Sequence, residues 1–251
     1  MRSCLRGWSP IGPVLCAALL AAPPAGADTR GDQALGEMDQ AMNRGKTHYF
    51  EYELVNQEPG KAEKKLGLKV FIKGGKRLAE FTAPGDMKGT KLLILSATEM
   101  YAYLPAFGKV RRISSSNTDQ GIMGLAFNQN DLATQTYSPS YQAQLASETT
   151  TEWKIAATPK AGQTTAYGKI EFTVTRDKKV PTEIKYYNAA GTLIRTETRT
   201  SYKCQADVCV PGELKMVDHA KGGHSTKVLS KAWKLNENLS DDLFTKRSLG
   251  Q

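Results

Sequence analysis

Residues 89–132 read GTKLLILSATEMYAYLPAFGKVRRISSSNTDQGIMGLAFNQNDL, and this stretch predicts the fold of the whole chain. Two apolar runs, at 92–95 and 100–104, are typical of strands. A turn with proline and glycine follows, and a basic third strand is predicted at 109–113. Beyond a segment rich in serine, a short apolar cluster occupies 122–127. The stretch therefore predicts a β-surface with a flap beside it, and it contains no catalytic motif.

The second apolar run carries apolar side chains on both faces of its strand. Successive strand residues point to opposite faces, so Met100, Ala102 and Leu104 share one face while Tyr101 and Tyr103 share the other. In a curled sheet one face would line a cavity, and the other would meet a helix or the outside. Ordinary core packing is the simpler interpretation of any single residue, whereas a cavity wall is the functional interpretation of the set.

Most of the remaining chain also reads as short strands separated by turns. The pattern predicts about ten or eleven strands, with a two-residue hairpin turn at Gly74 and Gly75. The candidate strands outside the opening stretch occupy residues 47–56, 66–73, 76–82, 143–157, 167–176, 181–188, 192–202, 208–216 and 225–235.

A sheet of this size has to curl or close, because long flat open sheets are unstable and prone to aggregation. Residues 32–44 are predicted to form an amphipathic helix, since Leu35, Met38, Ala41 and Met42 recur at helical spacing. Short helical turns are predicted at 128–132 and 240–244. The predicted fold class is mainly β: a single curled antiparallel sheet, an incomplete (unclosed) β-barrel, with an N-terminal helix that covers an open end or acts as a lid.

The N-terminus has the three parts of a secretory signal peptide. Arg2 and Arg6 precede an apolar stretch at 11–22, and Ala25-Gly26-Ala27 is a small-residue cleavage site. A membrane anchor is the alternative, but the apolar stretch is shorter than the roughly 20 residues that a spanning helix needs. We therefore expect a cleaved signal peptide at 1–27, one domain at 28–251 and an exported protein.

The charge of the chain is moderately basic. Removal of Arg2 and Arg6 with the signal peptide lowers the formal net charge of +9 by two. A solvated surface with surplus lysine is the simplest interpretation, and contact with anionic membrane surfaces is the functional one. The dispersed charge and the predicted export argue against a nucleic-acid partner.

Two cysteines, Cys204 and Cys209, remain after the predicted cleavage. Cysteines in an oxidising compartment usually pair, and four intervening residues suit a local disulfide in a hairpin. A zinc site would need two further ligands at suitable spacing, and a redox role would favour the C-x-x-C spacing. We therefore predict a structural disulfide.

The residue types that carry catalysis do not assemble into a known pattern. His219 and His224 flank a glycine-rich turn next to Asp218, but such a turn is more often plain surface than a metal site. The sequence has no H-E-x-x-H and no G-x-S-x-G motif. We expect no enzyme activity, no cofactor and no metal.

Three segments are similar to a known family. GTKLL at 89–93, MYAYLPAFGKVRRI at 100–113 and IMGLAFNQNDL at 122–132 resemble the LolA-like family of outer membrane lipoprotein-sorting proteins. The ending LFTKRSL at 243–249 is also similar. The resemblance implies an unclosed antiparallel β-barrel with a helical lid around a hydrophobic cavity. It also implies a periplasmic protein that carries lipid or acylated protein between membranes.

One departure from the family pattern limits what the resemblance implies. Family members often have aspartate just before the phenylalanine of the M-G segment, and an aromatic residue shortly after it. Ala126 and Gln129 occupy those places here. No role of that acid is therefore expected in this chain.

The leading hypothesis is a monomeric periplasmic carrier that binds the acyl chains of a lipid or lipoprotein for transfer between inner and outer membrane. Arg111 or Arg112 would contact an anionic headgroup or a partner protein, and residues 32–44 and 114–127 would open to admit cargo. The candidate cavity and gate residues are Leu35, Met38, Met42, Met100, Tyr101, Tyr103, Leu104, Phe107, Ile122, Met123 and Phe127.

Two alternatives remain from the sequence. The first is an accessory protein without cargo, which would bind an inner-membrane transporter or another envelope partner by its sheet edge or basic face. The second is a lipid hydrolase, which the missing catalytic triad disfavours. A carrier would also need partners, namely an inner-membrane transporter and an outer-membrane acceptor.

Overall fold

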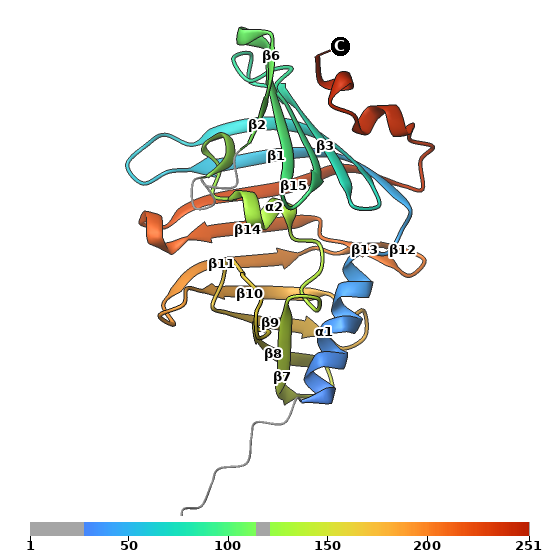
Figure 1. Cartoon of the computed structure of the whole chain (residues 1–251), viewed down its shortest axis with the longest axis vertical. Coiled ribbons are helices and arrows are strands. Elements are labelled where there is room, and N and C mark those ends of the chain that lie inside the picture. The colour runs from blue at the N-terminus through green and yellow to red at the C-terminus, as the bar shows by residue number, and fades with distance from the viewer. Residues whose placement is uncertain (1–27, 114–120, 251) are drawn as a thin grey trace, which may run out of the picture.

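The computed structural model describes residues 28–113 and 121–250 and is shown in Figure 1. The predicted signal peptide at 1–27 and residues 114–120 of the predicted gate lie outside the described residues. The helices are α1 (Thr29–Met42) and α2 (Gln129–Ala133), with short 3₁₀ turns at Pro105–Phe107, Ile122–Gly124, His219–Lys221, Asp241–Phe244 and Arg247–Gly250. The strands are β1 (Thr47–Gln57), β2 (Lys64–Lys73), β3 (Lys76–Ala83), β4 (Lys91–Ser96), β5 (Glu99–Leu104), β6 (Lys109–Arg112), β7 (Tyr141–Glu148), β8 (Glu152–Pro159), β9 (Lys169–Thr175), β10 (Pro181–Tyr187), β11 (Leu193–Thr200), β12 (Lys203–Gln205), β13 (Val208–Val210), β14 (Glu213–Asp218) and β15 (His224–Leu235).

One antiparallel sheet holds thirteen of these strands, in the order β6-β5-β4-β3-β2-β1-β15-β14-β11-β10-β9-β8-β7. Figure 1 shows β6 and β7 at opposite ends of the molecule, so the sheet does not close on itself. The remaining two strands, β12 and β13, form a separate hairpin. The predicted fold class, a single unclosed antiparallel sheet with few helices, is confirmed.

Helix α1 covers the edge of the sheet at β7. The carboxylate of Asp28 accepts a hydrogen bond from the Leu145 amide (2.8 Å), and that of Asp32 accepts one from the Ala143 amide (2.7 Å). These two side chains satisfy edge amides that would otherwise offer a template for another strand. Gly31 allows the close approach, because a Cβ atom there would lie 2.4 Å from the Ala143 carbonyl oxygen.

The helix begins and ends earlier than the predicted 32–44. Asp28 is the N-cap, and its side chain accepts hydrogen bonds from the amides of Arg30 and Gly31. Met42 is the last helical residue. The sequence-based boundary was wrong because apolar periodicity starts only at Leu35, whereas the true start depends on the cap. The two predicted helical turns, at 128–132 and 240–244, correspond to α2 and the 3₁₀ turn Asp241–Phe244.

Two predicted strands are each divided in two. The predicted strand at 143–157 is β7 and β8, because the hydroxyl of Thr149 accepts hydrogen bonds from the amides of Thr151 and Glu152 and makes a turn there. The predicted strand at 208–216 is β13 and β14, separated at Pro211 and Gly212. With these two divisions and the short β12, the described residues contain fifteen strands.

The predicted disulfide is confirmed. Cys204 and Cys209 face each other across the β12–β13 hairpin and are bonded to each other. The bond closes a loop that the hairpin already shapes, so its contribution to stability is about 2 kcal/mol at most.

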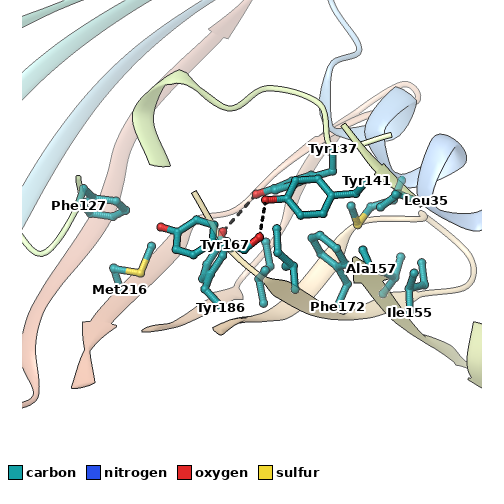
Figure 2. Close-up of a cluster of buried hydrophobic side chains, with 14 of the residues drawn as sticks. Leu35, Phe127, Tyr137, Tyr141, Ile155, Ala157, Tyr167, Phe172, Tyr186 and Met216 are labelled. Carbon is teal, nitrogen blue, oxygen red and sulfur yellow. Dashed lines mark hydrogen bonds between the residues drawn. The ribbon is translucent and has the colours of Figure 1, made fainter. Parts of the chain in front are cut away.

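The two faces of the sheet are covered by different parts of the chain. We call the face against which α1 and α2 pack the inner face; its core contains Leu35, Phe172, Met216 and a group of tyrosines (Figure 2). The outer face of β3 to β6 is covered by the C-terminal segment, where Phe244 and Leu249 pack against Leu78 and Leu93. The side chains of β4 alternate between the two faces: Leu93 packs on the outer face, whereas Leu92 and Ile94 belong to a cluster on the inner face.

Candidate ligand cavity

An apolar cavity of about 310 Å³ lies against the inner face. It holds on the order of ten non-hydrogen atoms, because one water molecule occupies about 30 Å³ in the liquid. Its wall combines alternate residues of the strands with residues of the segment 121–133, which we call the cover segment. The apolar side chains in the wall are Met42, Leu54, Leu68, Val70, Ile72, Ala79, Phe81, Leu92, Ile94, Ile122, Leu125, Phe127, Leu132, Leu214 and Val228.

Strand periodicity explains why these residues meet. Successive residues of a strand alternate between faces, so Arg77, Ala79 and Phe81 of β3 all point to the inner face. Arg77 lies between Ile72 of β2 and Ile94 of β4 in the strand register. The cavity wall is therefore a direct product of the antiparallel register of β2, β3 and β4.

The cover segment is tied to the sheet by buried hydrogen bonds. The amide of Ala126 donates to the hydroxyl of Thr226 (2.8 Å), and the side-chain amide of Asn56 donates to the Gly124 carbonyl (3.0 Å). The Thr226 hydroxyl in turn donates to the side-chain Oδ1 of Asn56, and Nε2 of His224 also bonds to this oxygen. The segment is thus held over the cavity by a few polar contacts from β1 and β15.

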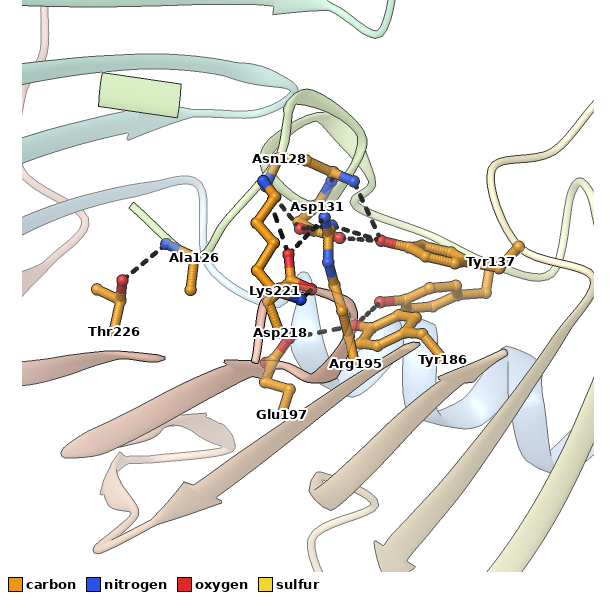
Figure 3. Close-up of polar contacts among 11 residues, drawn as sticks. Ala126, Asn128, Asp131, Tyr137, Tyr186, Arg195, Glu197, Asp218, Lys221 and Thr226 are labelled. Atoms are coloured by element: carbon orange, nitrogen blue, oxygen red, sulfur yellow. Dashed lines mark hydrogen bonds and ion pairs between the residues drawn. The ribbon is translucent and has the colours of Figure 1, made fainter. Parts of the chain in front are cut away.

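A buried charge network fixes the second half of the cover segment (Figure 3). Arg195 of β11 forms ion pairs with Asp131 of α2 (2.8 Å) and with Asp218 of β14 (3.2 Å). The Tyr167 hydroxyl donates a short hydrogen bond to Asp131. Burial raises the pKa of Asp131, and the Arg195 charge opposes that effect. The pairing with Arg195 therefore offsets part of the cost of burying the Asp131 carboxyl group.

A second network lies beside the first one. Arg199 forms an ion pair with Glu197, whose carboxylate also accepts a hydrogen bond from the Tyr186 hydroxyl (3.2 Å). The Tyr186 and Tyr137 hydroxyls lie 3.2 Å apart. An Nη1 of Arg199 lies 3.1 Å from the sulfur of Met42, at the end of α1. Strand β11 thus presents alternate charged residues to the interior, and Met42 at the end of α1 contacts the last of them.

A second pocket, of about 420 Å³, adjoins the apolar cavity. The residues that line both pockets form a dividing wall between them. They are Met42, Asn43, Tyr52, Ile72, Arg77, Gln135 and Arg199. The second pocket extends to His48, Lys46 and the disulfide hairpin. The two guanidinium groups therefore lie between an apolar chamber and a more polar one.

His48 in the second pocket is expected to make stability depend on pH. Because the Trp233 indole N–H can only donate, Nδ1 of His48 accepts it (3.2 Å) and Nε2 donates to the Arg44 carbonyl (2.9 Å). Burial lowers the pKa of His48, so the unfolded state binds more protons, and stability should fall as pH drops from 7.5 through this lowered pKa. The slope should be at most about 1.4 kcal/mol per pH unit for this histidine.

Urea unfolding at several pH values measures this effect. His48→Gln should reduce the slope, and because burial also lowers the pKa of His224, the double variant with His224→Gln should reduce it further. An unchanged slope in the double variant would contradict the assignment of the effect to these histidines.

Three of the sequence-predicted residues line the apolar cavity: Met42, Ile122 and Phe127. Four others are packed in the inner-face core and are not in the cavity wall, namely Leu35, Met38, Met100 and Met123. Leu35, Met38 and Met100 have no exposed surface.

The remaining predicted residues lie away from the cavity. Tyr101 and Tyr103 are on the outer face, packed against the C-terminal segment. Leu104 ends β5, and Phe107 in the following turn is 62% exposed. The sequence pattern could not assign a face to these residues, because both faces of β5 are apolar and both are covered.

Arg111 and Arg112 lie on the short edge strand β6, and both are exposed. The Arg111 guanidinium lies 5.7 Å from the centre of the Phe107 ring, and Arg112 donates to the Thr98 carbonyl (3.0 Å). Charged residues on a short edge strand also protect it against pairing with other sheets.

Sequence reasoning missed the charged residues of the interior. Arg195, Glu197 and Arg199 alternate with threonines along β11, and alternating charge is normally taken to mark a solvent face. The available signal was the alternation of charge at every second residue, positive, negative and positive. Such residues share one face of a strand, where neighbouring opposite charges can pair. Arg77 gave no such signal.

An open antiparallel sheet with a helix at one edge and an apolar cavity on its inner face defines the LolA-like fold class, and the resemblance found in the sequence is confirmed. A family model described as "Uncharacterized protein" matches residues 73–251, and the chain belongs to this family. The comparison with curated proteins found no match. Within the described residues, none of the helices is long and apolar enough to cross a membrane.

Three solved structures are similar over most of the chain. A DUF1329 family protein from Desulfovibrio piger is 22% identical, with a TM-score of 0.81, and the match covers 89% of this chain and 99% of that one. A protein domain from Vibrio parahaemolyticus, described as outer membrane lipoprotein-sorting, is 22% identical (TM-score 0.77; 88% and 99% covered). A LolA superfamily protein from Nitrosomonas europaea is 19% identical (TM-score 0.69; 87% and 98% covered). These likenesses establish the fold.

Proposed function

We propose that this protein is a periplasmic carrier that binds an acyl chain of a lipid or lipoprotein in the apolar cavity and transfers it between inner and outer membrane. The observation that carries the proposal is the cavity of about 310 Å³ on the inner face, walled by aliphatic and aromatic side chains. Each methylene buried there contributes about 0.8 kcal/mol. The carrier would act after export, with the predicted signal peptide at 1–27 removed, and as a monomer.

The size of the cavity limits what it holds at rest. A space for on the order of ten atoms fits part of one chain, so longer or multiple chains require the wall to widen. Unlike the strands of the wall, the cover segment is held to the sheet by side-chain contacts and not by a strand ladder. Bonds such as Ala126 to Thr226 would have to break when it moves. Loading from an inner-membrane transporter and release to an outer-membrane acceptor would drive such a change.

Filling the cavity should abolish binding. Ala79 faces the cavity next to Leu92, so Ala79→Phe places a ring where a chain would lie. We expect at least a tenfold loss of affinity for methyl decanoate, an uncharged chain of suitable length, measured by calorimetry. Native mass spectrometry of protein from periplasm should also show less bound lipid.

The control for this experiment is Ala190→Phe in the exposed turn between β10 and β11. It adds the same ring outside the cavity and should bind like the wild type. The carrier proposal fails if wild-type protein binds no chain, or if Ala79→Phe binds as well as the control while remaining folded.

One observation favours a second candidate function, an accessory protein that binds an envelope partner. The edge strand β6 has no strand partner on its outer side among the described strands, and its tip carries the exposed Phe107 with Lys109 and Arg111 nearby. A photo-crosslinker at position 107 in intact cells would capture such a partner. Capture of one defined protein, combined with absence of bound lipid, would favour this function over the carrier.

A further inference from the structure

Arg77 is an inward-facing cation without a counterion among the described residues. It comes from β3 and lies in the wall between the apolar cavity and the second pocket. Its Nη1 donates to the Leu132 carbonyl (2.8 Å), which is a neutral partner. Its Nε is buried and has no hydrogen-bond partner in the part of the chain described. An arginine normally uses its planar set of five donors more fully than this.

The other charges of the cavity wall are already paired. Glu197 forms an ion pair with Arg199, and Asp131 forms one with Arg195. Neither carboxylate is therefore available to Arg77. No ion pair of Arg77 within 4.0 Å is present in residues 28–113 and 121–250. Burial, with the nearby Arg199 charge as a smaller contribution, lowers the pKa of Arg77. The Arg77 side chain is partly buried and its Nε is fully buried, so a charge held there without a counterion costs stability, and its presence needs a reason beyond folding.

We propose that Arg77 is the anion-binding group of this cavity, and that the ligand is an amphiphile with an anionic head, a carboxylate or phosphate monoester, on a single unbranched chain. The head would bind at Arg77 in the dividing wall, and the chain would extend into the apolar cavity. This inference rests on the proposed carrier function and specifies its ligand class.

The arrangement of the wall supports this orientation. On one side of Arg77 lie Val70, Phe81 and other apolar residues that suit a chain, and on the other side lies the more polar pocket. The free Nε, beside an Nη group, offers the two parallel donors that a carboxylate or phosphate accepts. The cavity volume fits on the order of ten atoms and thus one short chain.

Binding of three probes with the same chain length tests the inference: decanoate, decyl phosphate and methyl decanoate. Calorimetry at pH 7.5 should give wild-type affinity at least tenfold higher for one or both anionic probes than for the ester. Arg77→Met should lose this preference and still bind the ester. The comparison between decanoate and decyl phosphate identifies which head group the site prefers.

The matched control is Arg176→Met, which removes an exposed arginine from the turn after β9 and should keep the preference. Thermal unfolding checks the fold, and Arg77→Met should be at least as stable as the wild type because it removes a partly buried charge that has no counterion among the described residues. If the ester binds to the wild type as well as the anions, or if Arg77→Met keeps the preference, the inference about Arg77 is overturned while the carrier function stands. If no probe binds to the wild type, both are overturned.

Discussion

Replacing Arg195 by methionine is expected to lower the free energy of unfolding by about 3–5 kcal/mol, the usual cost of removing one partner from a buried ion pair. The side chains of Arg195, Asp131 and Asp218 are 5%, 3% and 1% exposed, so solvent cannot replace the lost guanidinium. Two carboxylates would remain in the interior, and Lys221 lies 3.8 Å from one of them, that of Asp218. Urea unfolding at pH 7.5 measures the loss.

The pH dependence of the stability of this variant is a second, independent test of the network. Burial already raises the pKa of Asp131, and loss of Arg195 would raise it further. A carboxyl group whose pKa is raised in the folded state favours folding at low pH, and this contribution is lost as the pH rises. The difference in unfolding free energy between Arg195→Met and the wild type should therefore become smaller when the pH is lowered from 7.5 to 5. Adding Asp131→Asn and Asp218→Asn should recover part of the stability.

The matched control is Arg176→Met at the surface. Arg176 forms an ion pair with Glu148, and both side chains are substantially exposed, so the change should stay within about 0.5 kcal/mol. A loss in Arg195→Met no larger than in this control would refute the view that the network of Figure 3 holds the cover segment to β11 and β14.

Replacing Gly31 by alanine is expected to displace α1 from the sheet edge and to cost about 1–3 kcal/mol, the usual range for an added atom in a packed interface. A Cβ atom at Gly31 would lie 2.4 Å from the Ala143 carbonyl oxygen and 2.6 Å from the Gln144 Cα atom. Both are backbone atoms of β7, so they cannot turn aside as a flexible side chain would. Urea unfolding and limited proteolysis of α1 both report the effect.

Gly36→Ala is the control on the same helix. A Cβ atom at Gly36 meets nothing within 4 Å, and alanine is the better helix former by about 1 kcal/mol. The two identical substitutions, five positions apart, should therefore have opposite signs. If both stabilise the protein, the close contact between α1 and β7 does not form in solution.

These two predictions concern the elements that position the cavity. Helix α1 supplies Met42 to its wall, and the cover segment supplies Ile122, Phe127 and Leu132. Loosening either element should also raise the rate at which a chain exchanges, because each covers the inner face. The proposed binding should therefore be coupled to stability through these two contacts with the sheet.

The residue pattern alone is enough to predict the fold class and the disulfide. Alternating apolar residues and glycine turns predict antiparallel strands, and the C-x₄-C spacing predicts a local bond between Cys204 and Cys209, because both depend on neighbours in sequence. The same local reasoning failed at Thr149, where a threonine side chain makes the turn without glycine or proline. It also failed to separate cavity from core, as Met100 shows.

Only the tertiary structure could decide which inward charges are paired. Asp131 and Arg195 are 64 positions apart, and they meet because α2 folds back over β11. Among the residues that the structure describes, Arg77 is left with a single carbonyl partner because Glu197 and Asp131 are already paired with other arginines. Such pairing depends on strand register and on which segment covers the sheet. No local pattern encodes it, and so the charged centre of the cavity became visible only in three dimensions.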